Sequence, residues 1–507
     1  MPILHRFLAR SILAGAAVLA AACGSLRPVD LPAEYTPGPA PAELWATLAA
    51  ERPGDWYVLL NDGPTALDWR LRAIDSATES IDLQTFLWTV DVVGSLVLDH
   101  LVAAAERGVT VKLLVDDSFL LGQDDMLLEL VSHPNIEYRV YNPYKRRSDN
   151  AVTRQALNLA EFHRLDHRMH NKAMIVDNRV AIVGGRNLAD EYFGLHAVAN
   201  FRDMEVIAGG PIVLDVSAEF DRYFNDRWAV PIESLSHVRH TAADLDAARK
   251  VREENVHIHA EQTDAERLAA WQALVANALD GKGTLFADKP PEENPAEAGE
   301  APVQVANALM GIIDAAQEEV LIVSAYLIPT PALEGAVRRA VERGVRIRML
   351  TNSIRSNNHL TAHSAYRNHI RTLLDSGAEL HEVRIDATDR DIYMLSPIEE
   401  KKLALHAKAL VIDTDKVFIG SANLDPRSLR INTEMGLLIE SEALNAEVRK
   451  AVAPDFSNTN SWQLELDEQD RVVWVSHDVT LTEQPAGSVM QRIEDWFFSH
   501  LPIEDEL

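Results

Sequence analysis

The chain carries one short phrase twice, with the same internal spacing and at a constant offset. The first copy contains His170 and Lys172, and the second contains His406 and Lys408; 406 − 170 and 408 − 172 both equal 236. The same offset relates the acids and amides that follow in the two copies, which are Asp177, Asn187, Asp413 and Asn423. Such a repeat predicts two similar halves that together build a single site.

Length and charge support this division. A chain of 507 residues is longer than one hydrophobic core usually serves, so two cores are expected. The formal net charge of −29 disfavours nonspecific binding of nucleic acid, which depends on a basic surface that displaces counterions. We therefore expect no nucleic-acid partner.

The N-terminal residues have the pattern of an export signal. Residues 1–22 have a basic start and an apolar run that is short for a membrane span. Cys23, the only cysteine, follows Leu19–Ala22 as in a bacterial lipobox, and residues 23–45 are rich in Pro and Ala, like a tether. The pattern predicts export and a lipid anchor on Cys23 at a periplasm-facing membrane, with Gly24 favouring the outer membrane. Cleavage without lipidation is the alternative.

Each half also contains an amphipathic helix that ends at a glycine and lies between two apolar segments. The helices are expected at Leu96–Glu106, before Gly108, and at Leu333–Glu342, before Gly344. Strand, helix and strand in this order predict a βαβ unit and a largely parallel sheet, hence an α/β fold. The expected domains are a first lobe at 46–240, a charged linker or insertion at 241–302 and a second lobe at 303–507.

The C-terminal region adds two local patterns. Trp462–Val475 is expected to form a hairpin. A helical stripe follows, formed by Val489, Met490, Ile493, Trp496, Phe497 and Leu501. We interpret the stripe as core packing, and a face that dips into a membrane is the alternative.

Strand parity separates the residues of the repeated phrase. Residues two apart on a strand share a face, so each His and Lys should project together. Asp177 and Asp413 have the opposite parity and should brace the fold from behind. The glycines that follow allow a close approach of backbone to a ligand, next to Asn187 and Asn423.

These side chains suit phosphoryl transfer. Two Lys and two Asn can stabilise an oxyanion, while one His attacks phosphorus and the other moves the proton of the departing and incoming alcohols. Asp203 and Glu434 occupy matching places after the two phrases and are expected to orient the imidazoles. The symmetry of the sequence leaves open which His attacks. No convincing metal-binding pattern is evident.

His-x-Lys-x4-Asp followed by Gly-Gly/Ser-x-Asn, present twice, resembles the signature of the phospholipase D superfamily. Further segments, such as Arg168–Lys172 and Asp425–Ser428, look like those of the bacterial cardiolipin synthase C type. The resemblance implies two α/β/α sandwich lobes related by a pseudo-two-fold axis, with the site at their interface and no metal or other cofactor. It also implies that His170 is the nucleophile and His406 the general acid and base. Single-copy relatives acquire the second motif by dimerising, so this chain is expected to be a monomer.

Substrate contacts are harder to predict. A locally basic segment precedes the first phrase, from Lys145 to Arg168, and suggests a receptor for an anionic headgroup; an ordinary solvated loop is the alternative. A second region, Thr351–Tyr366, follows a strand of the second half, where α/β proteins place ligands. Candidate substrate contacts are Arg168, Tyr141 and Tyr366.

The leading hypothesis is transfer of a phosphatidyl group. A phosphatidyl-histidine would form from one phospholipid, and phosphatidylglycerol would then attack it to give cardiolipin, with a membrane of phosphatidylglycerol and phosphatidylethanolamine as partner. The alternatives are hydrolysis to phosphatidic acid, an exported phosphodiesterase or nuclease, and a non-enzymatic lipid-binding adaptor.

Overall fold

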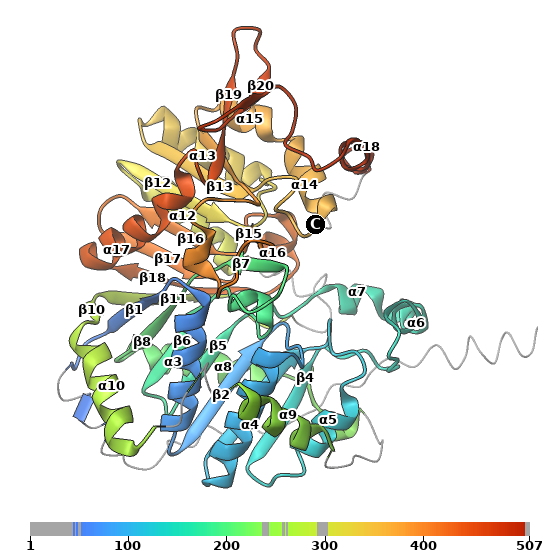
Figure 1. The fold of residues 1–507 in the computed structure, drawn as a ribbon, viewed down its shortest axis with the longest axis vertical. Coiled ribbons are helices and arrows are strands. Elements are labelled where there is room, and N and C mark those ends of the chain that lie inside the picture. The colour runs from blue at the N-terminus through green and yellow to red at the C-terminus, as the bar shows by residue number, and fades with distance from the viewer. Residues whose placement is uncertain are drawn as a thin grey trace, which may run out of the picture.

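The computed structural model describes residues 44–45, 47–48, 52–235, 243–255, 259, 262–291 and 303–501. The predicted signal sequence, Cys23 and nearly all of the predicted tether lie outside these residues. Within them, the chain forms two lobes, each built around one large sheet, as predicted (Figure 1). In the part of the chain that is described, none of the helices combines the length and apolar composition needed to cross a membrane.

The first lobe has a nine-stranded sheet. In spatial order its strands are β10 (Leu279–Asp280), β1 (Trp56–Leu60), β8 (Glu205–Gly209), β6 (Val180–Gly184), β5 (Ala173–Val176), β2 (Ser80–Thr85), β3 (Thr110–Asp116), β4 (Ile136–Tyr141) and β9 (Ala229–Pro231). Its α-helices are α3 (Gly63–Ser76), α4 (Val92–Glu106), α5 (Asp124–Leu130), α6 (Ala151–Leu157), α7 (Phe162–Asp166), α8 (Ile212–Phe224), α9 (Ala243–Glu254) and α10 (Asp264–Ala276).

The second lobe has a ten-stranded sheet. In spatial order its strands are β11 (Lys282–Ala287), β18 (Met435–Glu440), β17 (Lys416–Gly420), β16 (Lys408–Ile412), β12 (Glu319–Ser324), β13 (Arg346–Asn352), β14 (Glu379–Val383), β19 (Ser461–Leu466), β20 (Val472–Val475) and β21 (Thr480–Leu481). Its α-helices are α12 (Gln304–Ala315), α13 (Pro331–Glu342), α14 (Leu360–Arg367), α15 (Ile370–Asp375), α16 (Pro426–Arg430), α17 (Glu442–Val452) and α18 (Val489–Phe498).

The predicted βαβ units are present, but the sheets are not largely parallel. Strands β2, β3 and β4 run parallel, as do β12, β13 and β14. Gly108 and Gly344 follow the crossover helices with φ of 97° and 89°, a conformation that glycine adopts without strain. The remaining pairs in each large sheet are antiparallel. Among them, the repeated phrase forms the hairpins β5–β6 and β16–β17, which reverse the chain without a crossover helix.

The segment 241–302 does more than link the lobes. It contains two helices, α9 and α10, and after them strand β10 pairs with β1 of the first sheet. The next strand, β11, pairs with β18 of the second sheet. This short stretch therefore adds an edge strand to both lobes, which a linker would not do.

A shared apolar core joins the lobes. Buried residues of α8, such as Val216 and Phe220, belong to the same cluster as Leu437 of β18 and Val448 of α17. Burying one such side chain contributes about 1.5–3 kcal/mol, so this cluster holds the lobes in a defined arrangement.

The C-terminal predictions had opposite outcomes. The hairpin is present as β19 and β20. The helical stripe was predicted to be core, and this was wrong: Val489 on α18 is 69% exposed and Trp496 is 54% exposed. The polar side of α18 faces the protein instead, since Asp495 is its one buried residue.

Candidate active site

A small sheet between the lobes sets the position of the second histidine. Strand β7 (Ala199–Arg202) of the first lobe runs parallel to β15 (Lys402–Leu405) of the second, with Arg202 opposite Leu405. The residues that follow are Asp203 and His406. Asp203 Oδ2 lies 2.6 Å from His406 Nδ1, so an acid of the first lobe holds the imidazole of the second.

The reciprocal contact forms at an isolated bridge. Met169 of the first lobe lies opposite Thr433 of the second, and the His170 backbone N–H donates to the Thr433 carbonyl at 2.9 Å. Both carboxylate oxygens of Glu434 then lie 2.9 Å from His170 Nδ1. The structure thus brings both predicted acids to the histidines, and it pairs each acid with the histidine of the opposite lobe.

Aromatic rings enclose both imidazoles. The Phe86 ring is 4.9 Å from that of His170, and the Tyr192 and Phe201 rings are 4.9 and 5.2 Å from that of His406. Because a carboxylate occupies each Nδ1, Nε2 is the ring nitrogen left for chemistry. Sequence reasoning missed these three rings as parts of the site.

Both lysines lie beside the histidines that precede them. Lys172 Nζ donates to the His170 carbonyl at 2.7 Å, and Lys408 Nζ contacts the His406 carbonyl and lies 3.1 Å from its Nδ1. Both side chains are buried. Burial lowers the pKa of Lys172 to about 7 and that of Lys408 to about 8, so binding of an anion beside them would favour their charged forms.

The surroundings of both histidines disfavour their protonated forms. Burial and the neighbouring Lys172 and Lys408 hold the pKa of His170 well below its ordinary value. Burial and Lys408 lower the pKa of His406 to about 3, against the opposing effect of Asp203. A neutral imidazole with Nδ1–H directed at a carboxylate presents a lone pair on Nε2, which is the form that a nucleophile or a general base needs.

The two acids differ in charge. Burial raises the pKa of Glu434 to about 7, although Lys172 acts in the opposite direction. Burial also acts against ionisation of Asp203, but His406 and Lys408 outweigh it and hold the pKa of Asp203 below its usual range. The site is therefore asymmetric: His406 has the fully ionised partner.

Gly185 in the first half and Ser421 in the second occupy equivalent positions, and each lies beside one of the two acids. A Cβ atom on Gly185 would lie 2.3 Å from Asp203 Oδ1, so this position needs glycine for the acid to reach His406. The equivalent residue of the second half is Ser421, whose hydroxyl donates to Glu434 Oε2 and accepts from the Met435 N–H at 3.0 Å. The Gly-Gly and Gly-Ser patterns contained this signal.

The other residues of the phrase are placed as follows. Asn187 accepts from the Leu87 N–H at 3.2 Å and donates to the Tyr192 hydroxyl at 2.9 Å, while Oδ1 of buried Asn423 has no hydrogen-bond partner among the described residues. Asp177 accepts from the Glu79 and Ser80 N–H groups at 2.7 and 2.8 Å. Asp413 likewise accepts from the Glu318 N–H at 2.8 Å. Both acids hold the start of a neighbouring strand.

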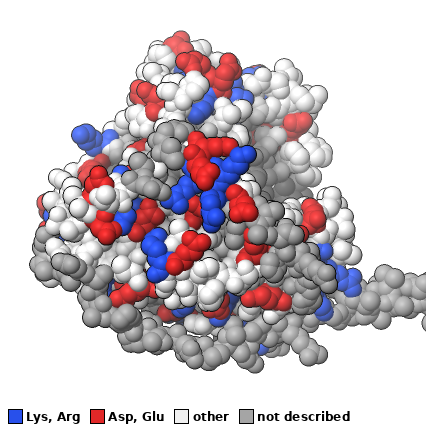
Figure 2. Space-filling model, turned by 60° about the horizontal axis from the view of Figure 1, so that its bottom comes forward, with Lys and Arg blue, Asp and Glu red and all other residues white. Residues whose placement is uncertain are grey.

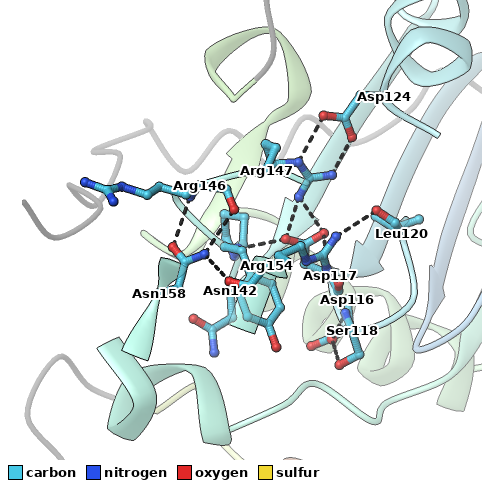
Figure 3. A network of polar contacts seen from close by, with 12 residues as sticks. Asp116, Asp117, Ser118, Leu120, Asp124, Asn142, Arg146, Arg147, Arg154 and Asn158 are labelled. Carbon is cyan, nitrogen blue, oxygen red and sulfur yellow. Dashed lines mark hydrogen bonds and ion pairs between the residues drawn. The ribbon is translucent and has the colours of Figure 1, made fainter. Parts of the chain in front are cut away.

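The basic segment before His170 is not an open anion receptor. Arg147 pairs with Asp117 and Asp124, and Arg154 pairs with the same Asp117 at 3.2 Å (Figure 3). Arg154 also donates to the Leu120 carbonyl at 2.9 Å. Acids that precede the segment in sequence therefore pair with these two arginines and hold them against the lobe.

The three candidate substrate contacts are buried. Arg168 donates to the Asn142 carbonyl at 3.1 Å and lies 3.6 Å from Asp116. Tyr141 and Tyr366 are 1% and 2% exposed and belong to the apolar cores. Their surroundings favour packing roles over contact with a substrate.

One group of side chains has the spacing of a metal site. In the described part of the chain, ligand atoms of Asp75, His100 and His259 lie within 4.8 Å of one another, and sequence reasoning did not predict this group. It belongs to the helical layer of the first lobe, and its imidazoles already bond to carboxylates, at 2.7 Å for His100 to Asp75.

Comparisons with known proteins agree with this geometry. The family model described as cardiolipin synthase, PLD-like domain, matches residues 71–228 and 309–455. Cardiolipin synthase C of Escherichia coli is 34% identical over 480 residues, which cover 90% of this chain and 97% of that protein. Cardiolipin synthase B of the same organism is 24% identical over 404 residues, or 78% of this chain and 79% of that protein.

A solved structure extends the likeness to the fold. The phosphatidylserine synthase of Haemophilus influenzae superposes with a TM-score of 0.55 at 14% identity, covering 81% of this chain and 90% of that one. At this identity the match shows the fold alone. On the matched family and the identity to cardiolipin synthase C, the chain belongs to the phospholipase D superfamily and is cardiolipin synthase-like.

Proposed function

We propose that this protein transfers a phosphatidyl group between phospholipids and makes cardiolipin from phosphatidylglycerol and a second phospholipid. The observation that carries the proposal is the crossed pairing of two histidines with acids of the opposite lobe, beside two buried lysines. The 34% identity to cardiolipin synthase C supports the choice of substrate.

In the first step, His170 Nε2 attacks the phosphorus of the donor lipid. A P–N bond forms and the P–O bond to the headgroup alcohol breaks. His406, which takes up a proton from solvent when the anionic phosphodiester binds beside it and Asp203, gives the Nε2 proton to the departing alcohol. In the second step, neutral His406 takes the proton of the incoming glycerol hydroxyl, whose oxygen displaces His170. Lys172 and Lys408 stabilise the negative charge that builds on the phosphoryl oxygens.

The electrostatic asymmetry supports this division of labour. The imidazolium that the acid step requires is best stabilised beside a full negative charge, and Asp203 supplies one to His406. His170 faces Glu434, whose pKa of about 7 leaves less negative charge beside the nucleophile. The sequence repeat could not distinguish the two histidines.

Two observations bear on the competing readings. The net charge is −29, and on the face drawn in Figure 2 basic and acidic side chains alternate rather than form a basic field, which disfavours a nuclease.

Hydrolysis uses the same two histidines, so transfer and hydrolysis differ only in the acceptor that reaches the intermediate. Export and a lipid anchor on Cys23 remain predictions.

Product analysis tests the proposal. The purified chain is incubated with vesicles of phosphatidylglycerol and phosphatidylethanolamine, and the lipids are analysed by mass spectrometry. Cardiolipin is expected, and its formation should disappear in His170→Ala but persist in His163→Ala, which removes an exposed histidine. Phosphatidic acid as the main product would replace transfer with hydrolysis, and cleavage of DNA without lipid products would favour the nuclease.

A donor with an activated leaving group tests the roles. A phosphatidyl ester of p-nitrophenol needs little acid assistance, so His406→Ala should still release p-nitrophenol once and accumulate phosphohistidine at position 170. His170→Ala should release none. Accumulation of the adduct at position 406 in a His170→Ala chain would reverse the assignment.

A further inference from the structure

Helix α18 is packed with its polar side against the protein. Its buried residue Asp495 accepts from Ser364 Oγ at 3.0 Å and from Arg367 at 3.0 Å, and it bonds to His363 Nδ1 at 2.8 Å. Gln491 donates to the Ile354 carbonyl at 2.9 Å. These contacts fix the rotation of the helix about its axis. The opposite face of α18 is therefore exposed in a defined orientation.

The outward face is apolar along the whole helix. Its residues recur at helical spacing and are 52–69% exposed: Val489, Met490, Ile493, Trp496 and Phe497. Such a continuous stripe of large apolar side chains is unusual for a surface in water and marks a contact surface.

A second exposed apolar surface comes from the first lobe. Across α6, the following turn and α7, Val152, Leu157, Leu159 and Phe162 are 41–77% exposed. The charges of this stretch are withdrawn from solvent or paired: Arg154 is buried, and Glu161 bonds to Arg164 at 2.6 Å. We call these four residues and the five of α18 the apolar rim.

Both parts of the apolar rim are tied to the histidines. Helix α7 ends at Asp166, four residues before His170. Helix α18 rests on the loop that follows β13, and Asn352 at the end of β13 exchanges hydrogen bonds of 2.8 Å with the backbone of Leu405, the residue before His406. Figure 1 shows α6, α7 and α18 along the same side of the molecule.

We propose that the apolar rim inserts into the surface of a phospholipid bilayer and so presents lipid headgroups to the histidine pair. This inference rests on the proposed function, since only a lipid substrate requires the site to meet a membrane. Apolar side chains with Trp and Phe on one helical face suit the boundary between headgroups and acyl chains. The two parts of the apolar rim come from different lobes and are both connected to the histidine pair. A planar bilayer can contact both parts at once and supply the substrate to the site between them.

The cysteine content permits a local test. Cys23 is the only cysteine, so Cys23→Ser gives a full chain without thiols, into which single cysteines are placed by Phe497→Cys, Leu159→Cys or Leu214→Cys. Leu214 on α8 is 50% exposed but outside the apolar rim, and is the matched control. An environment-sensitive fluorophore at positions 497 and 159 should shift to the blue when phosphatidylglycerol and phosphatidylethanolamine vesicles are added, and the control should not.

Other occupants give different outcomes. Emission at positions 497 and 159 that lies to the blue of the control without vesicles, and moves further as the protein concentration rises, would mean that a second copy of the chain covers the apolar rim. The same blue emission at every protein concentration would mean that another segment of the same chain covers it. The absence of any vesicle-dependent shift at 497 and 159 would overturn the inference.

Activity separates this inference from the proposed function. In Trp496→Ser/Phe497→Ser, the rate on vesicles should fall by about tenfold or more, while the rate on a short-chain phospholipid below its micellar concentration should stay unchanged. Leu214→Ser should change neither rate. Vesicle-dependent shifts in a chain that is inactive on every phospholipid would refute the proposed function but support the membrane contact. Activity on the short-chain phospholipid without any vesicle-dependent shift would support the proposed function but refute the membrane contact.

Discussion

The carboxylate of Glu434 lies 2.9 Å from Nδ1 of His170, although the two residues are 264 positions apart and belong to different lobes. The reciprocal pair, Asp203 and His406, crosses in the other direction at 2.6 Å. Neither half of the chain therefore holds a histidine together with the acid that orients it. The duplicated chain needs both lobes docked before either imidazole has its tautomer fixed.

The two crossed pairs should respond unequally to neutral substitutions. Asp203→Asn removes the full charge that stabilises the His406 imidazolium and should lower kcat by about 10²–10⁴-fold. Glu434→Gln should lower kcat by a smaller factor, because burial already raises the pKa of Glu434 to about 7 and so reduces its negative charge at neutral pH. Steady-state rates on vesicles at neutral pH measure both. Equal losses would contradict the charge asymmetry.

The buried lysines should set the alkaline limb of activity. Burial lowers the pKa of Lys172 to about 7, so its cation is present below that pH and is lost as the pH rises. We expect kcat/KM to fall above about pH 7, and Lys172→Arg, if active, to move the fall to higher pH because arginine keeps its charge. Lys172→Ala should cost about 2–4 kcal/mol of transition-state stabilisation. A profile unchanged in Lys172→Arg would rule out this lysine as the titrating group.

The glycine beside Asp203 should be needed for activity. In Gly185→Ala the new Cβ would overlap the carboxylate of Asp203, so that the acid is pushed from His406 or the backbone shifts, at about 1–3 kcal/mol of stability. Ser421→Ala, at the equivalent position, removes the hydrogen bonds of the hydroxyl with Glu434 and with the Met435 N–H but forces no overlap with the acid. Activity and thermal unfolding of both variants test this. A Gly185→Ala chain with unchanged kcat would show that the acid need not occupy this place.

Local patterns predicted the parts of the site but not their pairing. The offset between His170 and His406 indicated two halves. Strand parity does not apply to Asp177, which lies in the turn after β5 with a φ of 52°. The crossing depends on the register between β7 and β15, which are about 200 residues apart in sequence, and no local pattern encodes it. The orientation of α18 was missed for a similar reason: its period is the same whether its stripe is buried or exposed, and the distant partners of Asp495 decide which.

The pH dependence of stability should report the cluster around His259. Burial lowers the pKa of His259, but hydrogen bonds and charges from Asp68 and Asp75 outweigh it and raise that pKa above its ordinary value of 6.5. A raised folded-state pKa stabilises the protein fully below pH 6.5, and this contribution is lost as the pH rises through the folded-state pKa. His259→Gln should therefore destabilise by about 1–3 kcal/mol in acid and by less in alkali, as measured by urea unfolding between pH 5.5 and about 9. The exposed control His163→Gln should show no such trend, and a constant difference between wild type and His259→Gln across this range would mean that the pKa of His259 is the same in the folded and unfolded states, against the raised pKa.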